Sequence, residues 1–260
     1  MKNHDRIVIE YGRFYHLSLR QQSKESALGG IRQNSKWSIS LNVAAMINIC
    51  LNMIMLLLLL FRTAHDQLSF VSCVVLILSF VSLIFDHSVV ALGVYIGESR
   101  LLQMLSKMRC GLHAIVMPLL FVPITEACTR TNLISQTGGN ITTFISFILA
   151  AHEAIIWYKY DIHNLVLLDR RDSVVHTGLS FAGSLSYVSG RGFKAFAPAI
   201  LLNLFALLVG MYLSWNGFCG EYLFMCALIT LLSNVLNDPF AQMFGETVLL
   251  SGIYRTLLLL

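Results

Sequence analysis

Two pairs of adjacent ionisable residues lie inside apolar stretches of this 260-residue sequence. They are Asp86-His87 and His152-Glu153, and a further histidine, His113, lies in another apolar stretch. Ionisable side chains are costly in a membrane interior, where they commonly mark ion or proton paths. Imidazole exchanges protons near neutral pH. These five residues are therefore candidates for a transport path.

The positions of these groups along the expected helices place them toward one side of a membrane. At 1.5 Å per residue, Asp86 lies ~27 Å along a helix that begins at Leu68, and His152 lies ~16 Å along one that begins at Ile141. Simpler interpretations remain open. Asp86-His87 would also suit a helix end at the interface, and Glu153 would suit an ion pair with Lys159 or Arg109. Adjacent helical residues point about 100° apart, so neither pair by itself forms a dyad.

The elements that must position these residues are membrane-spanning helices. Only 12% of the residues are charged, against about 25% in typical soluble domains. The run 39–61 has no ionisable side chain, and its length exceeds the ~30 Å hydrocarbon layer. We predict an all-α polytopic membrane protein with six transmembrane helices, at 39–61, 68–96, 110–126, 141–158, 195–215 and 218–236.

Three further segments complete the predicted organisation. Residues 1–38 form a basic cytosolic tail, and 159–194 form a charged cytosolic loop with an interfacial helix near 162–168 and a shallow membrane contact near 179–188. Pro118 and Pro123 interrupt the third span, where proline removes a backbone donor. Residues 237–260 contain Glu246 and Arg255. We favour an amphipathic or re-entrant helix there, with a seventh span as the alternative.

The distribution of basic residues predicts orientation. With six spans, sixteen of the eighteen Lys and Arg residues lie on one side of the membrane. The positive-inside rule then places both termini in the cytoplasm. Such a basic tail beside an anchor signals topology, so we expect no nucleic-acid partner. The lipid bilayer is the expected environment, in the plasma membrane or an internal membrane.

Small and amide side chains predict helix contacts. Asn48 and Asn52 share one helix face, because they lie four residues apart. Gly93 and Gly97 form a GxxxG pattern, which allows close approach of helices. These four residues are candidates for packing within the chain, in a homo-oligomer or against partner transmembrane helices.

Three function classes follow, in order of preference. The first is a small-solute or proton-linked transporter or channel. The second is an intramembrane lipid-modifying enzyme, which needs His87, His113 and His152 to converge. The third is a scaffold or assembly subunit without catalysis. The HExxH, GxSxG and phosphate-loop signatures are absent from the sequence, so we expect no catalytic residues, metal site or cofactor.

Overall fold

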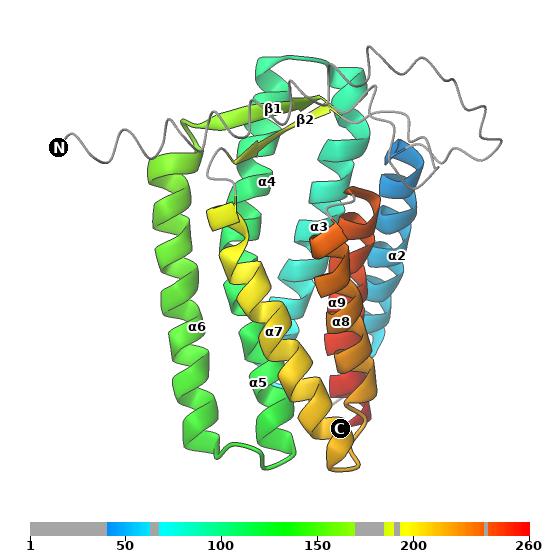
Figure 1. Ribbon diagram of the computed structural model, residues 1–260, viewed down its shortest axis with the longest axis vertical. Helices are drawn as coiled ribbons and strands as arrows, with labels where there is room; N and C mark the ends of the chain where they lie inside the picture. The colour runs from blue at the N-terminus through cyan, green and yellow to red at the C-terminus, as the bar shows by residue number, and fades with distance from the viewer. Residues whose placement is uncertain (1–40, 63–67, 170–184, 190–192, 237–238) are drawn as a thin grey trace. The chain divides into compact units, whose positions relative to one another are not determined.

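The computed structural model describes residues 41–62, 68–169, 185–189, 193–236 and 239–260 (Figure 1). The chain divides into two units, 1–36 and 37–260, and every described residue belongs to the second. The predicted basic tail, 1–38, lies outside the described residues. The elements in chain order are α2 (Leu41–Arg62), α3 (Phe70–Ile96), α4 (Arg100–Leu119), α5 (Phe121–Arg130), α6 (Gln136–Ile156), η1 (Trp157–Asp161), β1 (Leu165–Asp169), β2 (Leu185–Ser189), α7 (Phe193–Trp215), α8 (Glu221–Leu236) and α9 (Pro239–Leu259).

The predicted helical architecture is confirmed, and the described residues include five stretches that are long and apolar enough to cross a membrane. They are Val43–Phe61, Phe70–Gly93, Arg100–Arg130, Gln136–Asp161 and Pro198–Trp215. Helix α8 contributes a shorter apolar stretch, Glu221–Ser233. A helix satisfies its own backbone hydrogen bonds, which is why such segments suit hydrocarbon.

The third predicted span, 110–126, is longer in the structure and is divided in two. Helix α4 begins at Arg100, where the Ser99 hydroxyl accepts a hydrogen bond from the Leu102 amide. This is an ordinary N-cap, and it starts the helix ten residues before the apolar run begins. The boundary between α4 and α5 falls at Leu120, between Pro118 and Pro123. Arg100, Lys107 and Arg109, which lie between the second and third predicted spans, are therefore helical.

The prediction of a helix near 162–168 is wrong, because β1 pairs there with β2 in an antiparallel hairpin. The π-helix η1 ends α6, and the Asn164 side-chain amide donates to the Tyr160 carbonyl at 2.8 Å. This bond takes up a carbonyl at the helix end, so the chain leaves the helix before Leu165. The predicted membrane contact at 179–188 lies outside the described residues except for 185–188, which belong to β2.

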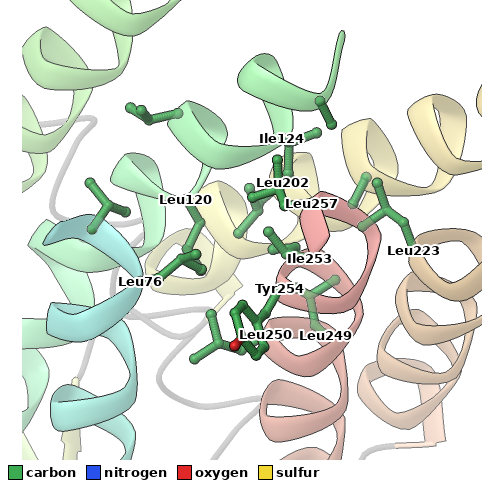
Figure 2. Packing of buried hydrophobic residues seen from close by; sticks show 14 of the residues in the cluster. Leu76, Leu120, Ile124, Leu202, Leu223, Leu249, Leu250, Ile253, Tyr254 and Leu257 are labelled. Atoms are coloured by element: carbon green, nitrogen blue, oxygen red, sulfur yellow. The ribbon is translucent and has the colours of Figure 1, made fainter. Parts of the chain in front are cut away.

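Helix α9 is packed against other helices of the bundle, and whether it lies at the interface or crosses the membrane stays a prediction. It contacts α8, α2, α3 and α5, and Figure 2 shows its apolar side chains gathered with those of neighbouring helices. Leu250, Ile253 and Leu257 are each at most 2% exposed. Two glycines allow this packing. A Cβ on Gly245 would lie 2.5 Å from Ser233 Oγ, and one on Gly252 would lie 2.5 Å from the Cβ of Cys226 in α8.

Candidate functional site: a polar cluster on α3, α4 and α9

The first acid–histidine pair lies within an unbroken helix. Helix α3 continues through Asp86 and His87 to Ile96, so the pair does not mark a helix end. Asp86 Oδ1 lies 3.0 Å from Arg109 Nε on α4, and Asp86 Oδ2 lies 3.6 Å from His87 Nδ1. Arg109, considered above as a partner for Glu153, forms its ion pair with Asp86.

A second pair joins α4 to α9. His113 Nε2 lies 3.3 Å from Glu246 Oε1. His113 lies one helical turn after Arg109, so both side chains leave the same face of α4. Both partners of this pair remain partly open, with His113 26% and Glu246 32% exposed. Glu246 was visible in the sequence as an acid in an apolar tail, but only the packing of α9 brings it to His113.

The two pairs belong to one group, which we call the polar cluster: Asp86, His87, Arg109, His113 and Glu246. Asp86 is close enough to His113 for electrostatic interaction, and His87 is close enough to Glu246. Two carboxylates, one guanidinium and two imidazoles therefore meet between three helices. With neutral imidazoles the cluster carries a net charge of −1, and each bound proton raises that charge by one.

His87 is the least satisfied member of the polar cluster. Its side chain is completely buried, and neither ring nitrogen has a hydrogen-bond partner within the described part of the chain. A neutral imidazole carries one donor and one acceptor, and leaving a buried polar group unpaired costs about 1–3 kcal/mol. Other buried polar atoms of the described residues also lack partners, and His87 is the one that lies within a group of charged side chains.

The structure does not join His152 and Glu153 to this cluster. His152 is 63% exposed, and its Nδ1 lies 3.6 Å from the carboxylate of its own neighbour, Glu153. Of the three histidines required for the enzyme hypothesis, His87 and His113 therefore lie in the polar cluster and His152 lies beside Glu153. Among residues 41–62, 68–169, 185–189, 193–236 and 239–260, no group of three or more His, Cys, Asp or Glu side chains is arranged to hold a metal ion.

A second charged group, which we call the Glu126 cluster, comprises Ser69, Glu126 and Arg130. Glu126 Oε1 accepts from the Ser69 amide at 3.0 Å and from Arg130 Nη2 at 2.6 Å, and its Oε2 accepts from the Ser69 hydroxyl at 2.5 Å. Arg130 Nη1 also donates to the Leu257 carbonyl of α9 at 3.4 Å. This cluster ties the start of α3 to the ends of α5 and α9.

An apolar layer separates the two charged clusters. Along α9, eleven residues lead from Glu246 to Leu257, or ~16 Å. The intervening side chains include Leu250, Ile253 and Tyr254, which are buried against α3, α5, α7 and α8 residues (Figure 2). The Phe80 and Tyr254 rings meet edge to face, with centroids 6.4 Å apart. Packed apolar side chains thus lie between the polar cluster and the Glu126 cluster.

The predicted packing residues have separate roles. Asn48 and Asn52 are fully buried, and Asn52 Nδ2 donates to Thr247 Oγ1 of α9 at 2.9 Å. Gly93 is buried in α3. Gly97 instead ends α3 with φ 67°, and nothing lies within 4 Å of the position of a Cβ. Gly97 is therefore a helix-capping glycine, whose positive φ disfavours other residues, and Gly245 and Gly252 are among the glycines that make close helix contacts.

No model of a known protein family matches the chain, and no curated protein matches it. The geometry of the polar cluster and the apolar character of the long helices are the features that bear on function.

Proposed function

We propose that this chain is a multi-pass membrane transporter or channel, and that the polar cluster is part of a proton-linked path for a small solute. The observation that carries the proposal is the buried His87. Its ring nitrogens have no hydrogen-bond partner among the described residues, and it lies beside the Asp86 carboxylate and near that of Glu246 on another helix. Ionisable side chains held inside an apolar helix bundle are the usual components of a proton relay. Asp86, His87, His113 and Glu246 are the proposed relay residues, and Arg109 holds Asp86 in position.

The apolar layer supports a path that is open to one side at a time. The polar cluster has partly exposed members, while ~16 Å of packed apolar side chains lies between it and the Glu126 cluster. Alternating access requires a site that is closed from one side by such a layer. In this proposal the Glu126 cluster holds the far side closed, because it links α3, α5 and α9.

We also propose that α9 crosses the membrane as a seventh span. Its 21 residues are long enough, and each of its two charged side chains contacts a side chain of another helix. Glu246 belongs to the polar cluster, and Arg255 lies 5.6 Å from the ring of Tyr222, at the start of α8. A charge at a helix end can reach the interface. The amino end is then cytoplasmic, the carboxyl end lies on the opposite side, and fifteen of eighteen basic residues remain cytoplasmic.

Proton flux into vesicles tests the proposed function. The full chain is reconstituted into liposomes that contain a pH-sensitive dye, and a potassium gradient with valinomycin supplies the driving potential. We expect acidification faster than in protein-free liposomes, and loss of the difference in a variant with both Asp86→Asn and Glu246→Gln. Equal rates with and without protein, or an unchanged rate in the double variant, would overturn the proposal.

A further inference from the structure

Helix α6 presents a regular apolar seam that the rest of the described chain leaves open. Ile141, Ile145, Ile148, His152 and Ile155 follow one another at alternating spacings of four and three residues, the repeat of coiled-coil core positions. The four isoleucines are 47–56% exposed, and the His152 side chain is 63% exposed. In Figure 1, α6 lies at the edge of the bundle, beside α4 and α5.

The seam lies opposite the surface by which α6 packs on its own chain. Ser146 and Ala150 are buried, a Cβ on Gly139 would clash with Thr129 of α5, and Trp157 lies against Gly111 of α4. At about 100° per residue, these inward positions and the seam positions leave the helix in nearly opposite directions. The bundle itself therefore leaves the seam free for another helix.

His152 distinguishes this seam from an ordinary lipid-facing surface. It lies ~16 Å along the helix from Ile141, within the hydrocarbon layer, where an exposed ionisable side chain is costly. A single polar residue at a core position of a coiled coil is known to fix its register and number of strands. The isoleucines before and after His152 in the seam provide the apolar contacts of such an interface.

We propose that the α6 seam is a homodimer interface, occupied by α6 of a second copy of this chain. Two copies inserted with the same orientation are related by a two-fold axis along the membrane normal, so their α6 helices run parallel and in register. The two His152 side chains then face each other. A neutral imidazole has one donor and one acceptor, so the pair is self-complementary, and each ring gains a hydrogen-bond partner in addition to its 3.6 Å contact with Glu153 of its own chain.

Disulfide crosslinking in native membranes tests this arrangement. In a chain whose six cysteines are replaced by alanine, single substitutions Ile145→Cys and Ile148→Cys are compared with Phe147→Cys. Ile145 and Phe147 are both 47% exposed, but Phe147 points away from the seam. We expect oxidation to give crosslinked dimers from the two seam positions and few from Phe147→Cys. Crosslinking that is absent at the seam, or stronger at Phe147→Cys, would overturn the proposal.

A second measurement uses the natural cysteines and so does not depend on the folding of the altered chain. Two differently tagged copies are co-expressed, extracted in mild detergent and captured through one tag. We expect the second tag to be recovered, and His152→Leu to weaken the association about three- to thirty-fold, the range for one interhelical hydrogen bond in a membrane. Phe147→Ala is the matched control and should have no effect. Recovery of one tag alone would contradict the proposal.

Discussion

The carboxylates of the two charged clusters differ in how many hydrogen bonds they accept. Glu126 accepts hydrogen bonds from both donors of Ser69 and from two nitrogens of Arg130, at 2.5–3.0 Å. In the polar cluster, Asp86 has one close contact with Arg109, Glu246 has one contact at 3.3 Å, and His87 has no hydrogen-bond partner among the described residues. A satisfied network stabilises one conformation, whereas a partly satisfied one leaves capacity for a proton or a ligand. We infer that the Glu126 cluster stabilises the fold and that the polar cluster carries the proposed function.

The largest expected effect is on transport. Glu246→Gln keeps the size of the side chain and an oxygen that can accept from His113, but it removes the negative charge. We expect proton flux in reconstituted vesicles to fall at least about tenfold, in the range of a lost proton-transfer group, with little change in thermal stability. Glu153→Gln is the matched control, because Glu153 lies in α6 outside the polar cluster. Equal loss of flux in both variants would contradict the assignment.

Removal of the Glu126 carboxylate should lower the free energy of unfolding. Glu126→Ala leaves the Arg130 guanidinium, which is only 23% exposed, without its carboxylate. Breaking a buried ion pair by removing one partner costs about 3–5 kcal/mol, and partial exposure places this change near the lower value. We expect the free energy of unfolding in detergent to fall by about 3 kcal/mol, as measured by chemical denaturation. A loss below about 1 kcal/mol would mean that this cluster does not hold the helices together.

The packing of α9 predicts a smaller loss of stability. Gly252→Ala places a methyl group against Cys226 of α8, and overpacking of this kind costs about 1–3 kcal/mol. Gly138→Ala is the control, because the nearest atom would lie at an ordinary 3.5 Å and alanine favours helix by about 0.5–1 kcal/mol. Thermal denaturation should therefore separate the two variants. Equal midpoints would show that α9 does not pack closely on α8.

The smallest expected effect has the opposite sign. His87→Phe removes two ring nitrogens that lack partners in the described part of the chain, and we expect the protein to gain about 1 kcal/mol of stability. Flux should be lost in the same variant, because phenylalanine cannot carry a proton. Gain of stability with loss of function is the pattern expected of an active position. A destabilised variant with normal flux would make His87 a packing residue.

The membrane helices could be predicted from the sequence because a span leaves a long local signal. The uncharged run 39–61 agrees closely with α2, Leu41–Arg62. The true start of α4 was missed, because helix α4 extends beyond the apolar run through Arg100, Lys107 and Arg109. Hydropathy indicates which residues are apolar enough to lie in lipid, whereas the Ser99 cap determines where the helix begins.

Long-range contacts could not be predicted in the same way. Glu246 and His113 are 133 positions apart, and nothing in either local sequence indicates the other. The hairpin of β1 and β2 also depends on pairing across a connection of fifteen residues.

Arg255 is the reason why the sequence favours an interfacial helix over a span at 237–260, since an arginine in an apolar stretch disfavours a span unless it lies near the interface. Its contact with Tyr222 is visible only in the folded chain.

Access of water to the polar cluster is the most direct test of the central claim, which is a polar site open to the cytoplasmic side and closed by the apolar layer. Single cysteines replace His113 and, as a control in the apolar layer, Leu250, in a chain with no other cysteine. A charged, membrane-impermeant thiol reagent is added to either face of oriented vesicles. We predict labelling of His113→Cys from the cytoplasmic face alone and none of Leu250→Cys. Labelling of His113→Cys from the opposite face, or from neither, would contradict this account.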